Sequence, residues 1–372
     1  MLKSLKLENF RCFPSFEMQQ LGRLNLIVGT NNSGKTSILE AIQLLTTQSH
    51  LEVLQILKDT MTERGEYIND KNGDYELDIR HLFYDRLIQI NSKFSIESQP
   101  ICLKDITLYL THIGDTKLVS STDLDKAVLP DELELLPDLR GFELNIERLG
   151  NPDGKLKLPL SSDDGLSFSH IKGFRRDLRN LPAKTQFIGL SSLTTEKTIE
   201  LFDQVVLTTE EELVTKALQI LEPNVKRVAA KGSERSRQNS SRGNLFVQLA
   251  NKQRIPIGSM GDGMWRILGL ALAIVNARDG VLLVDEIDTG LHFTVMSDMW
   301  KMLWETAKGL NVQIFATTHS NDCWQSLADI ANSENPSEDG ITIHRVEKGK
   351  PNSIVFTERQ IAIAAEHHIE VR

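Results

Sequence analysis

Apolar and polar positions follow two different periods in the N-terminal part of this chain. Residues 2–9 alternate between apolar and polar side chains, as a half-buried strand does, and residues 24–28 form an apolar run typical of a buried strand. Apolar side chains recur at helical spacing over residues 38–47, which predicts a helix. Between residues 83 and 113 the period shortens toward two, which predicts an antiparallel strand lobe.

The C-terminal part alternates regularly between helical and strand patterns. Helical spacing predicts helices over residues 264–276 and 293–308, and short apolar runs predict buried strands over 281–285 and 312–317. Residues 341–356 predict a hairpin. Buried strands that alternate with helices indicate a sheet covered by helices, so we predict an α/β fold built on a mixed sheet.

A glycine-rich loop joins the apolar run at 24–28 to the helix that follows it. Gly29 and Gly34 have the spacing G-x-x-x-x-G-K-[ST], which Lys35 and Thr36 complete. Glycines let backbone N–H groups surround phosphate oxygens, and the helix N-terminus adds its positive dipole end. Lys35 would reach the β- and γ-phosphates of ATP, and Thr36 would offer its hydroxyl to Mg²⁺. The residues predicted to bind the nucleotide here are Gly29, Asn31, Asn32, Ser33, Gly34, Lys35, Thr36 and Ser37.

Two further strand ends would bring charged side chains to this loop. One apolar run ends in Asp285 and Glu286, and the carboxyl end of a buried strand places such carboxylates beside a phosphate loop. Asp285 would hold Mg²⁺, and Glu286 would polarise the attacking water as the catalytic base. The next apolar run carries His319 to the same sheet edge, where it would bond a γ-phosphate. We therefore predict catalytic roles for Glu286, His319 and Lys35.

A second glycine-rich segment, Gly258-Ser-Met-Gly-Asp-Gly, precedes the apolar helix predicted from residue 264. Small residues at a helix N-terminus form an anion-binding end. A glycine-rich cap on a core helix is the structural alternative, and these residues taken alone favour it.

The motifs and the patterns divide the chain into three predicted regions. Residues 1–115 would form the N-terminal half of an ATPase head, with the phosphate loop and the antiparallel β lobe. Residues 116–255 would form a loop-rich and helical insertion, in which 193–222 predict helix broken at Pro223. Residues 256–372 would complete the head. The predicted fold is thus a P-loop α/β fold with an antiparallel β lobe and an inserted helical lobe.

Composition and charge restrict the cellular compartment and the kinds of partner expected for this chain. The three cysteines are far apart along the chain, which predicts free thiols in a reducing cytosol. No apolar run approaches ~18 residues, so we expect no membrane span. The net charge of −9 argues against coating nucleic acid with the whole surface. Two basic stretches, 172–184 and 226–242, leave DNA binding open, with solvated charged loops as the simpler interpretation.

Taken in order, the motifs resemble the ABC-class ATPase head shared by RecF, SMC and OLD-family proteins. The likeness is greatest to stand-alone bacterial AAA-type ATPases related to OLD proteins, some of which serve two-component phage-defence systems. It covers residues 1–48 and 255–325 and is weak between them. The matching segments are Asn9-Phe-Arg-Cys-Phe, Gly29–Thr36, Ser259-Met-Gly-Asp-Gly, Asp285-Glu286, Asp288-Thr-Gly-Leu-His and His319-Ser320.

The resemblance implies that two heads face each other and trap two nucleotides. Ser259 and Gly261 of one chain would touch the γ-phosphate bound by the other, and Asp288 would lie across the dimer seam. Arg11 would approach the nucleotide, with an exposed arginine at a strand end as the alternative. ATP would then drive formation of a homodimer or a higher oligomer, and hydrolysis would release it.

Departures from the family pattern shape the functional hypothesis. The segment Ser-Met-Gly-Asp-Gly is not the transporter signature, no heptads exist to build a long coiled-coil arm, and the tail after His319 lacks the Asp-x-Asp pair of an OLD nuclease. We therefore expect an ATP-hydrolysing switch that regulates a separately encoded effector protein, in a phage-defence setting. One alternative is a RecF-like repair clamp whose ATP-closed dimer binds DNA. The other is a nucleotide-dependent scaffold with little turnover.

Overall fold

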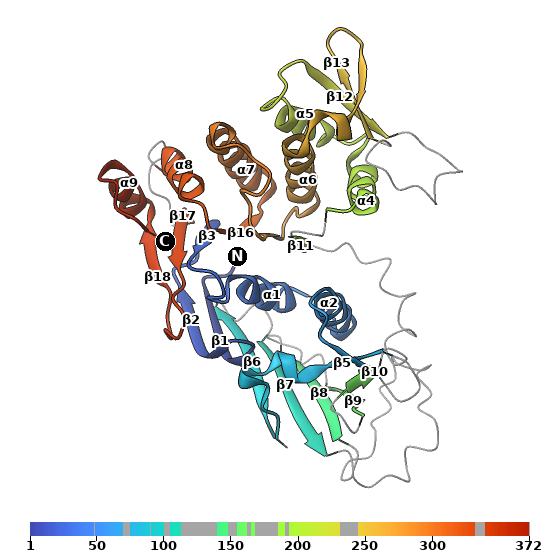
Figure 1. Ribbon diagram of the computed structural model, residues 1–372, viewed down its shortest axis with the longest axis vertical. Coiled ribbons are helices and arrows are strands. Elements are labelled where there is room, and N and C mark those ends of the chain that lie inside the picture. The colour runs from blue at the N-terminus through green and yellow to red at the C-terminus, as the bar shows by residue number, and fades with distance from the viewer. Residues whose placement is uncertain are drawn as a thin grey trace.

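A computed structural model describes most of the chain, and Figure 1 shows its arrangement. The predicted basic stretch 172–184 lies outside the described residues, as does most of 226–242. The described residues are 1–47, 49–69, 75–89, 91–99, 105–112, 140–147, 155–161, 165–167, 185–189, 193–230, 245–331 and 339–371.

A central sheet with strand order β11-β15-β16-β3-β17-β18 forms the middle layer. Its strands run parallel except β18, which pairs antiparallel with β17. Side chains alternate between its faces: along β3, Leu24 and Leu26 join one apolar cluster and Ile27 joins the other. The strands are β3 (Leu24–Val28), β11 (Thr185–Ile188), β15 (Val281–Val284), β16 (Gln313–Thr318), β17 (Ile341–Arg345) and β18 (Ile354–Thr357).

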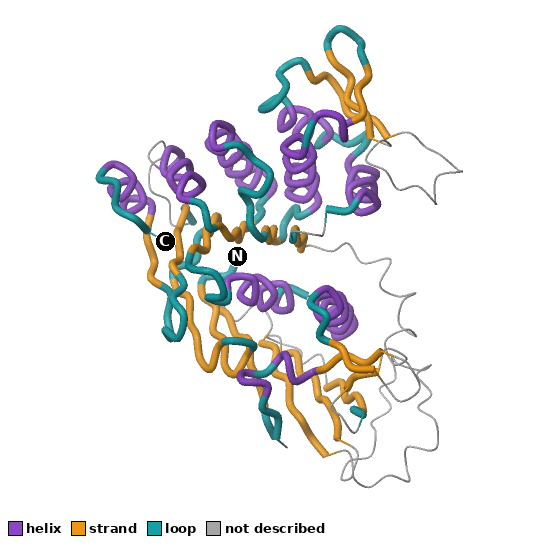
Figure 2. The backbone as a smooth tube through the Cα atoms, in the orientation of Figure 1, coloured by secondary structure: helices purple, strands orange, loops and turns teal. Residues whose placement is uncertain are grey.

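Helices cover both faces of this sheet (Figure 2). The α6 to α9 helices lie on one face, while α1 and α2 lie on the other. The apolar stretch of α6 is almost wholly buried, which explains its strong sequence signal. None of the described helices has the length and apolar character to cross a bilayer. The helices are α1 (Lys35–Leu45), α2 (His50–Glu63), α6 (Asp262–Asn276), α7 (Met296–Leu310), α8 (Asn321–Ala331) and α9 (Glu358–Glu366).

The predicted antiparallel lobe is a sheet of order β2-β1-β6-β7-β8-β9, which packs beneath α1 and α2. Its core faces α1, so the two layers share one apolar cluster. Its β8 and β9 strands lie beyond residue 115, so the lobe extends into the predicted insertion. The strands are β1 (Ser4–Phe10), β2 (Phe13–Gln19), β6 (Lys93–Gln99), β7 (Asp105–His112), β8 (Arg140–Glu147) and β9 (Lys155–Pro159). A separate small sheet contains β4 (Tyr67–Asn69), β5 (Tyr75–Asp78) and β10 (Gly165–Ser167).

The helical lobe contains two helices where the sequence predicted helix up to Pro223. The α4 helix ends at Val205, and Leu207 has a left-handed φ of 65°, which interrupts the helical backbone. A short sheet of β12, β13 and β14 adjoins these helices. The elements are α4 (Thr195–Val205), α5 (Glu211–Leu218), β12 (Val225–Ala230), β13 (Leu245–Leu249) and β14 (Arg254–Pro256).

Candidate functional site

The phosphate loop connects β3 to α1, and its two motif glycines occupy positions that exclude a side chain. Gly34 has φ 99°, and a Cβ there would lie 2.3 Å from the Phe13 ring. A Cβ on Gly29 would lie 2.3 Å from the Val346 carbonyl oxygen. Close packing against β2 and the end of β17 therefore requires glycine at both positions.

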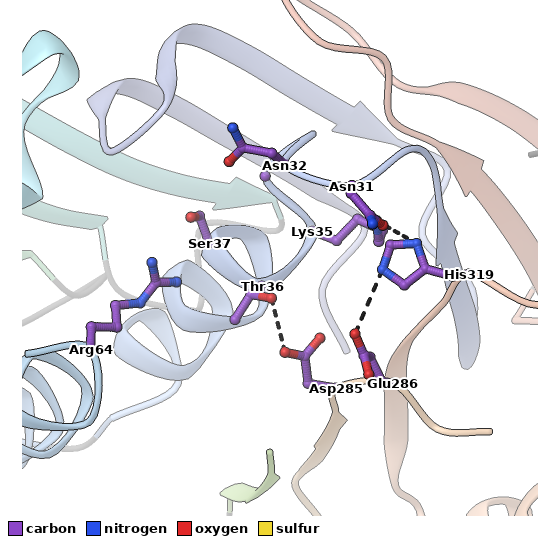
Figure 3. Close-up of a pocket in the computed structure, with 10 residues that line it drawn as sticks. Asn31, Asn32, Lys35, Thr36, Ser37, Arg64, Asp285, Glu286 and His319 are labelled. Atoms are coloured by element: carbon purple, nitrogen blue, oxygen red, sulfur yellow. Dashed lines mark hydrogen bonds and ion pairs between the residues drawn. The ribbon is translucent and has the colours of Figure 1, made fainter. Parts of the chain in front are cut away.

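The loop opens into a cavity of about 530 Å³ at the carboxyl ends of β3, β15 and β16 (Figure 3). Gly29 and Ser33 are buried and do not line it. Most of the predicted loop residues do line it, and so do the three predicted strand-end residues. The lining residues are Asn31, Asn32, Gly34, Lys35, Thr36, Ser37, Arg64, Asp285, Glu286 and His319.

Lys35 is held at the bottom of the loop. Its Nζ donates to the carbonyl oxygens of Gly29 and Thr30, both at 2.9 Å, and lies 3.4 Å from Nδ1 of His319. Burial lowers the pKa of its ammonium, and the nearby Asp285 and Glu286 carboxylates oppose that effect. The loop thus holds a buried cation whose hydrogen-bond partners are backbone carbonyl groups and a histidine ring.

Asp285 is fixed by hydroxyl groups from two different elements. The Thr36 hydroxyl donates to Oδ2 at 2.9 Å, and the Thr317 hydroxyl donates to Oδ1 at 2.5 Å. The first bond joins α1 to the end of β15, so the two predicted Mg²⁺ ligands lie side by side (Figure 3). A carboxylate and a hydroxyl that face a water-accessible cavity suit Mg²⁺, which keeps several waters and takes its other ligands from phosphates.

Glu286 and His319 face each other across the mouth of the cavity. Their Oε1 and Nε2 atoms are 3.7 Å apart, and about a third of each side chain is exposed to solvent. Glu286 has a left-handed φ of 47°, a conformation that costs a residue with a Cβ about 1–3 kcal/mol. Strain at a carboxylate in a cavity marks a position where geometry matters.

Arg266, which the sequence did not single out, fixes the backbone behind this pair. It lies on α6, is 6% exposed, and its Nη2 donates to the carbonyl oxygens of Asp285 at 3.0 Å and Glu286 at 2.8 Å. Burial lowers its pKa, opposed by the charges of Asp288, Asp285 and Glu286. Arg266 escapes sequence-based prediction because it lies within a helix that is otherwise mostly apolar.

The prediction that Arg11 approaches the nucleotide is not supported by its position. Arg11 is buried beside the cavity, with Nε 2.8 Å from Glu40 and Nη1 2.8 Å from Glu66, and it does not line the cavity. The exposed alternative is wrong as well, because two carboxylates neutralise the arginine inside the protein.

Arg64 reaches the cavity instead. It follows α2, and its Nε donates to Glu40 at 2.7 Å, which holds the guanidinium beside Ser37 (Figure 3). This position is on the side of the cavity away from His319. Nothing in the sequence motif pointed to Arg64, because α2 must fold back on α1 to bring it there.

The remaining predicted residues lie outside the cavity. Ser259 and Gly261 are exposed, and the Ser259 hydroxyl donates to the carbonyl oxygen of Pro256 at 2.7 Å. Asp288 accepts a hydrogen bond of 2.5 Å from the Thr318 hydroxyl. The start of α6 lies against the loop after Asp288, since a Cβ on Gly290 would be 3.9 Å from the Cβ of Asp262. The start of α6 thus lies next to the loop that follows Asp288. We call residues 259–263 the signature segment and its exposed face the signature surface.

Two family models match this chain. A family described as "AAA ATPase domain" matches residues 1–205. A second family, described as "AAA domain, putative AbiEii toxin, Type IV TA system", matches residues 118–322. Each match covers more than half of the chain.

Two curated relatives match over most of their length. An "ATP/GTP phosphatase" of Helicobacter pylori is 22% identical over 89% of this chain and 88% of its own. A "DNA replication and repair protein RecF" of Clostridioides difficile is 22% identical over 95% of this chain and 98% of its own. A solved Smc head bound to the C-winged helix domain of ScpA has TM-score 0.48 and 14% identity, covering 96% of this chain and 98% of that one. The SMC head of Thermotoga maritima has TM-score 0.41 and 13% identity over the same shares.

Proposed function

Because the chain belongs to the family of AAA ATPase domains, we propose that it is an ATP-driven switch that dimerises head to head and regulates a separate effector protein. The chain is a nucleotide-dependent ATPase with a P-loop α/β fold. One observation carries the proposal beyond that activity. The phosphate loop and its acidic partners meet in a single cavity, whereas Ser259 and Gly261 are exposed outside it.

In the proposed reaction each charged group of the cavity has one task. Lys35 releases the loop carbonyls and donates to the β- and γ-phosphates. Glu286 accepts a proton from the attacking water, and His319, 3.7 Å away, bonds the γ-phosphate and orients that water. Arg64 binds the nucleotide from the opposite side of the cavity, close to Ser37.

Mg²⁺ fits the acidic side of the cavity. Thr36 and Asp285 would hold it, because their side-chain oxygens are 2.9 Å apart and face the same space. When bound, Mg²⁺ would neutralise phosphate charge as the bond to the γ-phosphate breaks.

A second copy of the chain is the proposed occupant of the exposed signature surface. Backbone N–H groups at the start of α6 suit an anion, and Ser259 adds a hydroxyl donor. A γ-phosphate in the partner's phosphate loop supplies that anion, with Asp288 beside the seam. ATP would then stabilise the dimer because only the closed pair contacts it from both sides.

The test is the mass in solution of Glu286→Gln, measured by light scattering with and without ATP and Mg²⁺. We expect a shift from monomer to dimer with ATP, and no shift when Ser259→Arg is added. Ser15→Arg, an exposed serine on the β2 strand, is the matched control and should leave the shift intact. A mass that ignores ATP in every variant would refute the ATP-dependent dimer.

We propose the effector and the phage-defence setting with one family description in view. One matching family description names a toxin and a TA system, which fits a protein whose ATPase controls a harmful activity. We propose that the ATP-bound dimer holds or delivers that effector. Affinity purification of the Glu286→Gln variant with ATP, compared with Lys35→Ala, should retain a specific second protein only in the first case.

A RecF-like clamp is the second candidate, favoured by the full-length match to the RecF protein of Clostridioides difficile. In that case the closed dimer itself would bind DNA through basic residues. Fluorescence anisotropy with duplex DNA over a salt series separates the two functions. ATP-dependent, salt-sensitive binding that is lost when Arg175, Arg176 and Arg179 are reversed would favour the clamp.

A further inference from the structure

The catalytic carboxylate that we assign to Glu286 is held loosely by its side chain and firmly by its backbone. Its oxygens have distant neighbours: Thr289 at 3.4 Å and His319 at 3.7 Å. Its N–H donates to the Thr317 hydroxyl at 2.8 Å, and its carbonyl accepts from Arg266 at the same distance. The peptide groups on both sides of the Cα atom therefore set the direction of the Cα–Cβ bond, and with it the space that the carboxylate can reach.

The backbone of Glu286 also needs such restraint. A φ of 47° is unfavourable for a residue with a Cβ, and a relaxed backbone would turn the Cα–Cβ bond away from the cavity. Thr317 on β16 and Arg266 on α6 hold the two ends of this residue from different layers.

We propose that Arg266 is a positioning residue for ATP hydrolysis, which keeps the Glu286 carboxylate aimed at the attacking water by holding the Asp285 and Glu286 carbonyl groups. The proposal rests on the role of Glu286 given under Proposed function. Arg266 does not line the cavity, so it acts on the reaction through Glu286 and not on the nucleotide.

The position of Arg266 on α6 links the Asp285 and Glu286 carbonyl groups to the helix that begins in the signature segment. The same helix begins at Asp262, next to the exposed signature residues, and Arg266 is one turn further on. A small displacement of α6 on contact with a second head would thus move the Glu286 peptide directly. Engagement of the signature surface and alignment of the base would be two effects of one helix.

The decisive experiment is a double-mutant cycle between Arg266→Met and Glu286→Gln in the full chain. The turnover number and the ATP dissociation constant are measured for each variant, with single-turnover assays of labelled ATP where turnover is slow. We expect Arg266→Met alone to lower turnover by roughly 10- to 100-fold, the scale on which misplacement of a catalytic group acts. ATP affinity should stay within about twofold, because the phosphate loop is untouched.

In the Glu286→Gln background, adding Arg266→Met should cause no further loss, because the group it positions is already inactive. Losses that multiply in the double variant would show that Arg266 acts independently of Glu286 and would overturn the proposal, as would normal turnover in Arg266→Met. Arg278→Met, an exposed arginine beyond the end of α6, is the matched control.

If Arg266→Met does not fold, Arg266→Lys serves in the same cycle, since it keeps the cation but lacks the Nη2 atom that donates to both carbonyl groups. Normal turnover in Glu286→Gln alone would instead refute the base assignment, so the two failures are distinguishable.

Discussion

The phosphate loop and the signature segment differ in burial and in bonding. Lys35 and Asp285 are 6% and 9% exposed. Lys35 donates to carbonyl oxygens of the phosphate loop, and hydroxyl groups from α1 and β16 donate to Asp285. Ser259 and Gly261 are exposed, and the hydroxyl of Ser259 bonds within its own turn. The phosphate loop and Asp285, which we call the buried part of the proposed site, are already organised in a single chain. The signature segment presents its groups to solvent.

This difference separates two contributions to function. Groups fixed in advance can bind nucleotide and orient it without much reorganisation. Exposed groups contribute to the proposed reaction only when a second copy of the chain contacts them. A switch requires such a dependence on assembly. We therefore expect substitutions in the buried part to act on nucleotide binding and chemistry, and substitutions at Ser259 to act on assembly.

Lys35→Ala should have the largest effect, because it removes the cation of the buried part. We expect nucleotide affinity to fall by about 100-fold or more, since charge-assisted bonds to two phosphates are lost. Isothermal titration calorimetry with ATP measures this affinity. Lys301→Ala, an exposed lysine on α7, is the control and should bind normally. Unchanged ATP affinity in Lys35→Ala would show that the nucleotide binds elsewhere.

Glu286→Gln should separate chemistry from binding within the same cavity. Hydrolysis should fall by ~10² or more, the usual contribution of a general base, while ATP stays bound. Phosphate release and equilibrium binding measure the two quantities. Glu305→Gln, an exposed carboxylate on α7, should behave as wild type. Equal turnover in Glu286→Gln and wild type would rule out Glu286 as the base.

Arg64→Gln should have a smaller effect, and the same one on two nucleotides. Because Arg64 lies beside Ser37, away from His319, it should contact the part that ATP and ADP share. We expect both affinities to fall by about tenfold, the cost of a charge-assisted hydrogen bond. Competition with a fluorescent nucleotide measures both, with the exposed Arg86→Gln as control. A loss confined to ATP would place Arg64 at the γ-phosphate.

Much of the buried part could be predicted from the sequence, because its signals are local. The loop glycines have a fixed spacing, and Asp285 and His319 each follow an apolar run, so parallel strands bring them to one sheet edge. The central sheet and the antiparallel lobe were predicted by period, and the structure confirms both.

The errors and omissions arise where tertiary packing decides. Arg11 comes directly after a strand, where an exposed side chain is the usual expectation. In the structure it is buried, because Glu40 and Glu66, which lie elsewhere in the sequence, form ion pairs with it. Arg64 enters the cavity because α2 folds back, and Arg266 bonds the end of β15 because α6 packs there. No local pattern specifies these approaches, which involve residues far apart in the sequence.

Lowering the pH should reduce the free energy of unfolding of the protein. His344 on β17 lies beside β3, which leads into the phosphate loop, and full burial lowers its pKa from 6.5 to about 3. As pH falls below 6.5, the unfolded chain takes up a proton there that the folded protein refuses, so stability is lost with falling pH. At pH 5 the loss is about 2 kcal/mol relative to pH 7.5.

Urea unfolding between pH 7.5 and 5 checks this expectation. The difference in unfolding free energy between the two pH values should shrink in His344→Asn and stay unchanged in His367→Asn, an exposed histidine after α9. An identical pH slope in wild type and His344→Asn would show that folding does not lower the pKa of His344.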